Sequence, residues 1–192
     1  MKCKHLLYLL LCCSTFVSAQ IKYEREHRIR KNQFPETART LIAEEVQDAK
    51  KIKYYKEIDG DRTKYEAKLK KDRLWYSIEF NKDGVLEDIE ITVKPIDLPD
   101  ESYTAITNYL GRNFNTYRIQ KIQQQYIADQ NNVKATLKKA FQNLILPEVN
   151  YELMINGKNN KRYELFEMLF NAEGKFIKKR TALPPNYDHI LY

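Results

Sequence analysis

Residues 63–93, TKYEAKLKKDRLWYSIEFNKDGVLEDIEITV, contain three segments in which apolar and charged side chains alternate. Alternation with a period of two is typical of a β-strand that buries one face. Short polar stretches, KDR at 71–73 and NKDG at 81–84, separate the segments and suit tight turns. The stretch therefore predicts a meander of three antiparallel strands.

The alternation also predicts which side chains face the core. One face of the meander carries Tyr65, Ala67, Leu69, Leu74, Tyr76, Ile78, Phe80, Ile89, Ile91 and Val93. The other face carries Lys64, Glu66, Lys68, Trp75, Ser77 and Glu79, which we expect to be joined by Tyr55 and Glu57 of the preceding segment. The single tryptophan is thus expected on the solvent side of the sheet.

Helices are predicted before and after the meander. Phe34-Pro35 is expected to begin a helix that runs to about Lys51, because proline suits the first turn and apolar residues follow at helical spacing. A strand then leads into the turn Asp59-Gly60-Asp61. Leu98-Pro99 is expected to begin a second helix, which Gly111 ends. Further strands are predicted at 117–127, 151–155 and 162–170.

Two short motifs recur along the chain. The sequence FNKDG at 80–84 is echoed by FNAEG at 170–174, and Leu-Pro pairs stand at 98–99 and 183–184. We therefore predict an α+β fold, a tandem repeat of a helix plus a four-stranded antiparallel sheet. The first unit is placed at 34–97, the second at 98–184, and a tail at 185–192.

The second unit is expected to contain an extra amphipathic helix at 131–146. Its apolar residues, Val133, Leu137, Ala140, Phe141 and Leu144, follow one line, and lysines lie off that line. The strand around Leu165 is apolar on both faces, so this helix could cover one of them. A surface for a partner or for a dimer is the alternative.

The first nineteen residues have the layout of a secretory signal peptide. Lys2 and Lys4 precede a short apolar run, and Val17-Ser18-Ala19 suits cleavage before Gln20. A lipoprotein signal is less well supported, because Cys12 and Cys13 do not follow a small residue. All three cysteines lie in this segment, so no disulfide is expected in the mature chain. We expect a periplasmic or secreted protein.

The chain is basic, with a formal net charge of +7. The excess is spread out, except for a cluster at 22–31 in a basic amino-terminal arm, 20–33. We expect this arm to be solvated and poorly ordered, with contact to an anionic surface as the alternative. Nucleic acid is not an expected partner of an exported chain.

These residues also resemble a known family. The resemblance is to the PepSY-like periplasmic proteins of Bacteroidetes. It rests on the Pro-led helix, the YEAKLK strand, the strand ending in FNKDG, the LEDIEI segment and the Leu-Pro pair that begins the second unit. The resemblance covers about residues 34–184. It implies a β-lactamase-inhibitor-like fold and inhibition or protein binding, and it supplies no catalytic residues.

The sequence contains few candidate catalytic groups. After signal removal two histidines remain, His27 and His189, and neither has a ligand-spaced partner. There is no G-x-S-x-G elbow, glycine-rich phosphate loop or H-E-x-x-H pair. Asp59-Gly60-Asp61 fits a turn better than a calcium loop. We predict no catalytic, cofactor-binding or metal-binding residues; a hydrolase with facing carboxylates is the remaining enzymatic hypothesis.

The leading hypothesis is an exported non-enzymatic protein that binds another exported or envelope protein, for example as an inhibitor, through the helix-free sheet face. Exposed aromatic residues ringed by charges are good interface anchors. The predicted contacts are Trp75, Tyr55, Glu57, Lys68, Glu79 and Met154. Packing of the Trp75 ring across a lysine stem or beneath the second unit is the alternative for that residue. The alternative function is peripheral association with an anionic cell-envelope surface through the basic segments.

Overall fold

The predicted meander forms three neighbouring strands of the computed structural model, β4 (Arg62–Lys71), β5 (Leu74–Asn81) and β6 (Leu86–Val93). The structure describes residues 21–22, 24–159 and 162–182. The predicted signal peptide at 1–19 and the predicted tail at 185–192 therefore lie outside the described residues. The pairing of β5 with β6 contains one register shift, after which Phe80 is opposite Leu86.

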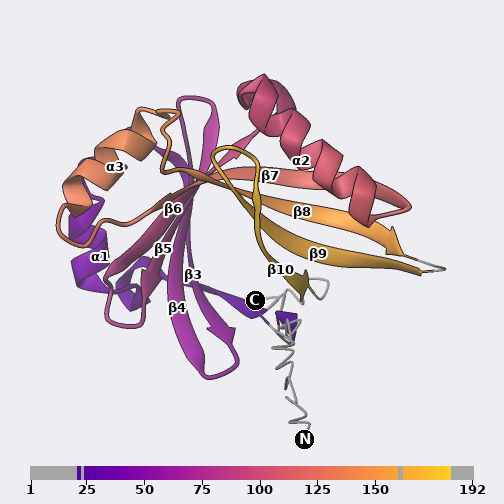
Figure 1. The fold of residues 1–192 in the computed structure, drawn as a ribbon. Coiled ribbons are helices and arrows are strands. Elements are labelled where there is room, and N and C mark those ends of the chain that lie inside the picture. Colours follow the sequence, from indigo (N-terminus) through magenta and orange to yellow (C-terminus); the bar gives the residue numbers. More distant parts are fainter. Residues whose placement is uncertain (1–20, 23, 160–161, 183–192) are drawn as a thin grey trace, which may run out of the picture.

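All the strands belong to one ten-stranded sheet, in the order β1-β10-β9-β8-β7-β6-β5-β4-β3-β2 (Figure 1). β1 pairs in parallel with β10, and every other neighbouring pair is antiparallel. The remaining strands are β1 (Ile21–Lys22), β2 (Glu24–Ile29), β3 (Lys50–Asp59), β7 (Thr116–Ile127), β8 (Asn150–Asn159), β9 (Arg162–Asn171) and β10 (Phe176–Ala182).

The predicted fold class, a tandem repeat of a helix plus a four-stranded sheet, is wrong. β6 pairs with β7 from Asp88↔Ile127 to Val93↔Ile122, so strands on both sides of Asp97 share one sheet. The recurring FNxxG motifs do form similar turns, in which the side chains of Asn81 and Asn171 each accept two backbone N–H bonds. That likeness is local and does not divide the sheet into two.

The basic arm also differs from expectation. Residues 24–29 form β2, which pairs with β3 along six residues rather than remaining a poorly ordered terminus. This strand lies at one end of the sheet order, and β1 lies at the other. A single residue of sequence separates the two strands, so the amino-terminal segment reaches both ends of the sheet.

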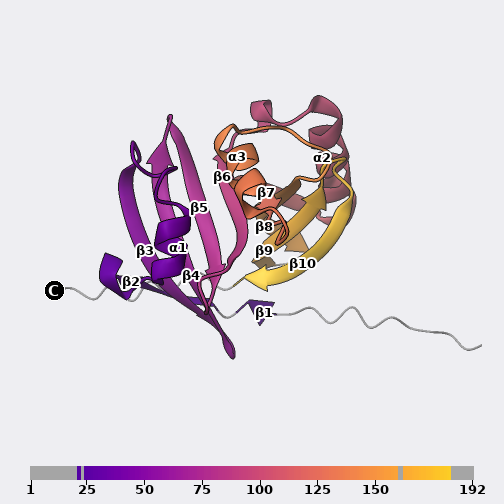
Figure 2. The same cartoon turned by 90° about the vertical axis from the view of Figure 1, so that its left-hand side faces the viewer.

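Three α-helices pack on one face of the sheet: α1 (Glu36–Leu41), α2 (Asp100–Asn113) and α3 (Val133–Phe141) (Figures 1 and 2). The 3₁₀-helices Lys31–Gln33 and Pro95–Asp97 precede α1 and α2. α1 is much shorter than the predicted helix, because three-residue turns such as Ala49 N–H to Val46 O follow it up to β3. α2 continues through Gly111 and ends at Asn113.

The extra helix docks within the molecule but not where it was expected. α3 packs on β6 and β7, and Phe141 stacks on Tyr76 of β5 with ring centroids 4.8 Å apart. The helix that covers β9 is α2, whose Tyr109 packs edge-on against Phe170. The prediction of an amphipathic helix is therefore confirmed, and its predicted place over the strand around Leu165 is wrong.

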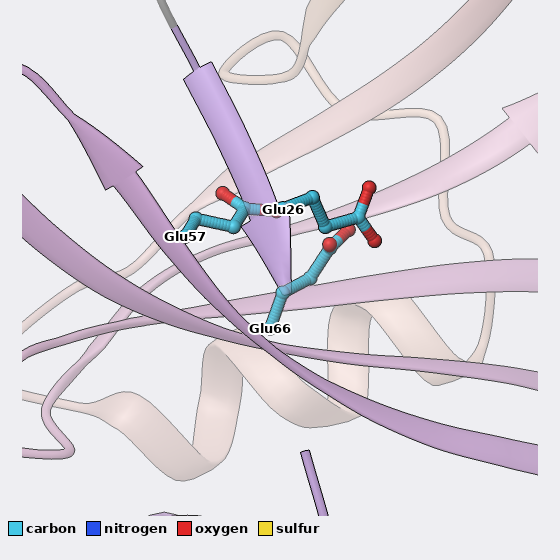
Figure 3. Close-up of side chains that lie close together, drawn as sticks. All are labelled: Glu26, Glu57 and Glu66. Atoms are coloured by element: carbon cyan, nitrogen blue, oxygen red, sulfur yellow. The ribbon is translucent and has the colours of Figure 1, made fainter. Parts of the chain in front are cut away.

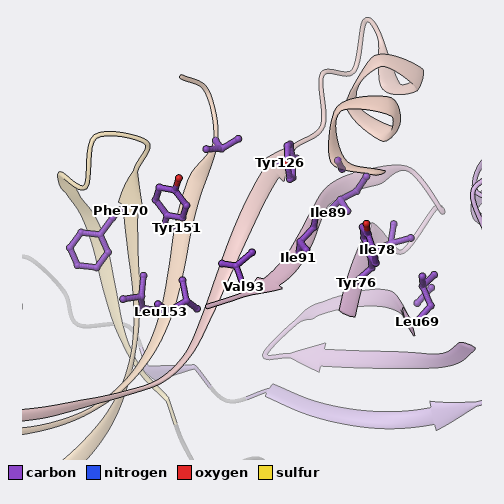
Figure 4. Close-up of a cluster of buried hydrophobic side chains, with 14 of the residues drawn as sticks. Leu69, Tyr76, Ile78, Ile89, Ile91, Val93, Tyr126, Tyr151, Leu153 and Phe170 are labelled. Carbon is purple, nitrogen blue, oxygen red and sulfur yellow. The ribbon is translucent and has the colours of Figure 1, made fainter. Parts of the chain in front are cut away.

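The core lies between the sheet and the helices. Figure 4 shows part of it, with side chains of neighbouring strands such as Ile78, Ile91 and Leu153. Ala67, Leu69, Tyr76, Ile78 and Phe80 are buried there, as the alternation predicts. Phe34 is also buried, against the rings of Tyr54, Tyr65 and Phe80, and Pro35 after it caps the start of α1, close to the predicted start of the helix. These side chains fix which face of each strand remains free of helices.

The sheet curls so that its helix-free face lies inside. Six strands separate β3 from β10 in the sheet order. Nevertheless, Arg180 Nη1 of β10 lies 3.6 Å from Asp59 Oδ2 of β3, and Arg180 also binds Glu167 of β9. These contacts draw the two ends of the sheet together and make the helix-free face concave.

Candidate functional site

The concave face contains a hollow of about 640 Å³ that spans the sheet from β2 to β10. We call it the hollow. Its lining is formed by Glu26, Lys51, Lys53, Tyr55, Glu57, Glu66, Lys68, Trp75, Tyr76, Ser77, Glu79, Glu90, Thr92, Lys121, Gln123, Glu152, Met154, Glu167 and Ala182. Strand alternation creates this lining apart from Tyr76, because every second side chain of each strand points away from the helices.

All six predicted contact residues line the hollow: Trp75, Tyr55, Glu57, Lys68, Glu79 and Met154. They come from β3, β4, β5 and β8. The alternation of side chains in the sequence therefore placed residues of four strands on the same face of the sheet. Trp75 is the most open of them, with 43% of its surface exposed, whereas Glu57 is only 6% exposed. The six residues therefore range from an exposed aromatic side chain, Trp75, to a buried carboxylate, Glu57.

The ring of Trp75 lies close to two lysines. The ammonium groups of Lys51 and Lys70 lie 5.5 Å and 5.7 Å from the centroid of its ring, within the range of cation–π attraction. The ring nevertheless remains well exposed. Trp75 therefore packs beside lysine stems and still offers an aromatic surface to the hollow.

The first acid cluster consists of Glu26, Glu57 and Glu66, whose carboxylates converge from β2, β3 and β4 (Figure 3). Lys68 Nζ lies 2.8 Å from Glu26 Oε1, 3.0 Å from Glu66 Oε2 and 4.9 Å from the centroid of the Tyr55 ring. Ser77 Oγ donates to Glu66. The cluster thus holds an internal ammonium group between carboxylates and an aromatic face.

These contacts shift the pKa values of Glu66 and Lys68. Burial alone would raise the pKa of Glu66, but hydrogen bonding with Glu57 and the charge of Lys68 leave that pKa below its usual value. Burial alone would lower the pKa of Lys68, whereas Glu66 and Glu26 raise it above its ordinary value. Glu66 and Lys68 therefore stay ionised as a pair.

The second acid cluster consists of Glu79, Asp88 and Glu90, on β5 and β6. Lys64 binds Glu79 at 3.0 Å, whereas Glu90 accepts a hydrogen bond from Gln123 Nε2 at 2.5 Å and Asp88 accepts one from Gln125 Nε2 at 2.9 Å. Neutral amides, rather than cations, therefore hold two of these three carboxyl groups.

Burial raises the pKa of Glu90 well above its usual value, and the nearby charges of Glu152 and Glu79 raise it further. Burial raises the pKa of Asp88 in the same way, again with help from Glu79. Strongly perturbed carboxyl groups in a concave site are typical of functional sites, although structural networks also produce them. Glu90 and Asp88 therefore lack the ion-pair partner that Lys68 provides for the first acid cluster.

Sequence reasoning missed several acids of the hollow, chiefly Glu26, Glu90, Glu152 and Glu167. Glu90 alternates with Ile89 and Ile91, which places it on the helix-free face, but the residue is only 5% exposed. Glu152 alternates with Tyr151 and Leu153, which would have placed it on the same face. Glu26 could not be found, because its segment was expected to be poorly ordered.

The other chemical candidates lie elsewhere. His27 follows Glu26 in β2 and therefore points to the opposite face of that strand. His189 lies outside the described residues. Asp59-Gly60-Asp61 forms the turn between β3 and β4, with Gly60 at φ +59°, as predicted. Each acid cluster brings three carboxylate oxygens within 4.8 Å of one another, a spacing that a divalent cation could bridge, and Lys68 already binds two residues of the first.

The basic segments of the alternative hypothesis are spread over the surface. On α3, Lys134 and Lys138 are exposed, whereas Lys139 forms an ion pair with Glu148 at 2.7 Å. β2 directs Glu26 into the hollow. In the described part of the chain, no helix has the length and apolar character needed to span a membrane.

No protein-family model and no curated protein matches this chain. Solved structures do share its fold. They include a DUF2874 family protein from Bacteroides ovatus, with a TM-score of 0.53 and 12% identity over 83% of this chain and 94% of that chain. A protein from Bacteroides eggerthii, named as a predicted periplasmic protein, has a TM-score of 0.54 and 11% identity over 81% and 93%.

A BLIP-like protein from Bacteroides fragilis has a TM-score of 0.50 and 11% identity over 83% of this chain and 92% of that chain. At such identities the likeness shows the fold alone. It supports the β-lactamase-inhibitor-like fold that the sequence resemblance implies. The PepSY-like family name is not confirmed.

Proposed function

We propose that this chain is an exported, non-enzymatic protein that binds another protein in the hollow. The observation that carries the proposal is that the six predicted contact residues, from Trp75 to Met154, all line this one concavity. Aromatic anchors set among charged side chains are typical of protein-binding surfaces. The three helices lie on the opposite face of the sheet (Figure 2), and Trp75 in the hollow is well exposed.

Export is supported by two observations. Residues 1–19 have the layout of a secretory signal peptide. The fold neighbour from Bacteroides eggerthii is named as a predicted periplasmic protein. A periplasmic location would also fit a chain whose cysteines all lie in that leader, since its stability then depends on the packed core and not on disulfides.

A binding role is favoured over catalysis by the ion pairs of the first acid cluster and of Glu167. Lys68 neutralises carboxylates of the first acid cluster, and Arg180 does the same for Glu167. The names of the fold neighbours indicate no catalytic family. Carboxylates held in ion pairs supply recognition and register at an interface more readily than proton transfer.

Site-directed photo-crosslinking tests the proposal. A photoreactive phenylalanine replaces Trp75 in the mature chain, which is incubated with envelope extract from the organism that makes it. Val85 is the matched control position, because it is 44% exposed against 43% for Trp75 and does not line the hollow. We expect a discrete crosslinked protein at position 75 and none at position 85.

The same crosslink should disappear when Glu57 and Glu79 are both replaced by glutamine. Identical products at positions 75 and 85, or no product at position 75, would count against a binding role for the hollow. Co-sedimentation with anionic lipid vesicles that fades steeply with salt, without a crosslink at position 75, would instead favour envelope association.

A further inference from the structure

The hollow is acidic although the chain as a whole is basic. Seven glutamates and four lysines line it, whereas the whole chain has a formal net charge of +7. A concave surface dominated by one sign of charge focuses the electric field and concentrates ligands of the opposite sign. Charge complementarity therefore favours a cationic group as the occupant.

Carboxylates also oppose one another directly across the strands. Glu66 is opposite Glu79 between β4 and β5, and Glu79 is opposite Asp88 between β5 and β6. Like charges at directly opposed positions destabilise a sheet. Lys68 already binds Glu66 and Lys64 already binds Glu79, whereas no ion pair among the described residues involves Asp88. A further cation near this row would therefore offset the repulsion that remains at its Asp88 end.

Lys68 shows how this surface holds a cation, between two carboxylates and the face of Tyr55. The second acid cluster has comparable parts, with Trp75 and Glu90 near one another because Trp75 is opposite Thr92 on β6. Among the described residues, however, no lysine or arginine forms an ion pair with Glu90 or Asp88. Asp88 Oδ1 is buried and accepts no hydrogen bond.

We propose that the hollow binds a lysine or arginine side chain of the partner protein, with Glu90 and Glu152 as carboxylate ligands and Trp75 as the aromatic wall along its stem. This inference rests on the proposed function, because it names the chemistry of the segment that the hollow receives. Long cationic side chains pack their methylenes on aromatic rings while their charged ends reach carboxylates.

The fluorescence of Trp75 gives a direct readout, because it is the only tryptophan of the chain. The probe is a capped tetra-arginine peptide, and its matched control is the tetra-citrulline peptide, which has a similar shape and no charge. We expect a saturable change with the arginine peptide and binding at least tenfold weaker with citrulline. Glu90→Gln and Glu152→Gln should each weaken binding by about tenfold.

Glu164→Gln is the control variant, because Glu164 is an exposed acid of β9 outside the hollow. It should leave the affinity unchanged. All variants are compared after circular dichroism and thermal unfolding show that they are folded. Equal binding of the two peptides, or unchanged binding by both hollow variants, would overturn the inference. Calcium chloride that alone gives the same fluorescence change and blocks the peptide would also overturn it.

The two proposals fail in different ways. A crosslink at position 75 without arginine-peptide binding would leave the protein-binding proposal standing and remove the cationic one. Peptide binding without a crosslink would leave the cation site standing and remove the protein partner.

Discussion

Trp75 is exposed on a strand whose neighbouring positions, Leu74 and Tyr76, pack toward the helices. Its position follows from parity alone, since successive residues of a strand point to opposite faces. The residue therefore contributes more to the surface of the hollow than to the core.

Replacing Trp75 with alanine should lower the free energy of unfolding by less than about 1 kcal/mol, as is usual for surface substitutions. Chemical denaturation followed by circular dichroism measures this change. Tyr76→Ala is the matched core comparison and should cost about 3 kcal/mol or more, because Tyr76 is buried and stacks on Phe141. A loss of similar size in Trp75→Ala would place that ring in the core.

Glu90 makes stability depend on pH. Its pKa is raised in the folded state by burial and by the acids that face it, Glu79, Asp88 and Glu152, while Lys121 acts in the opposite sense. The unfolded carboxyl group has a pKa of about 4.3. Below that value both states are protonated and the stabilising contribution is complete; it is lost as the pH rises toward the folded-state pKa.

The free energy of unfolding should therefore decrease between about pH 4 and the folded-state pKa of Glu90. Glu90→Gln should flatten this decrease, because the amide cannot ionise, whereas the exposed-site variant Glu164→Gln should keep it. Urea denaturation at intervals of pH measures both. A pH dependence identical in the wild-type chain and Glu90→Gln would show that Glu90 ionises normally.

At the scale of elements, α3 attaches to the sheet through one face. Thr136, Leu137 and Ala140 are buried, and the neighbouring Phe141 stacks on Tyr76. Phe141→Ala should lower the free energy of unfolding by about 2 kcal/mol, less than for a fully buried ring because Phe141 is half-buried.

Lys138→Ala, an exposed change on the same helix, should alter stability by less than about 0.5 kcal/mol. Denaturant titration of the two variants distinguishes these outcomes. Equal stability of Phe141→Ala and Lys138→Ala would mean that α3 is not anchored through its aromatic contact.

The elements also show what could be predicted from sequence. Alternation marks side-chain faces, and so the residues of the helix-free surface were placed correctly, as Lys68 and Glu79 illustrate. It does not mark which strand pairs with which, because pairing uses backbone groups that all residues share. The β6–β7 pairing that unites the sheet therefore left no sequence signal. Helical spacing over 42–49 was misleading, because successive three-residue turns can present the same apolar side chains to the core.

At the scale of the whole molecule, the curl of the sheet creates the hollow. Acids from strands far apart in the sheet order, such as Glu57 of β3 and Glu167 of β9, line one concavity only because the two ends of the sheet approach each other. Arg180 joins these ends through Glu167 and Asp59. The acidity of the hollow is thus a property of the curled sheet and cannot be assigned to any single strand.

Arg180→Met should therefore destabilise the fold and open the hollow. Glu167 is 2% exposed, so loss of its arginine partner weakens the compensation of a buried carboxylate, at a cost of about 3 kcal/mol. Asp59→Asn removes only the longer and more open contact and should cost less than about 1 kcal/mol. Denaturant titration measures both losses, and Trp75 fluorescence reports any change in the hollow.

The double variant Arg180→Met with Glu167→Leu distinguishes the cost of the buried Glu167 charge from the loss of the contact between Arg180 and Asp59. Replacing both members of a buried ion pair by apolar residues is often neutral or stabilising, so most of the lost free energy of unfolding should return. If the double variant stays as unstable as Arg180→Met, the contact between Arg180 and Asp59, and not the buried charge of Glu167, holds the ends of the sheet together. In that case Asp59→Asn should itself weaken binding of the arginine peptide, because the acids would no longer share one concavity.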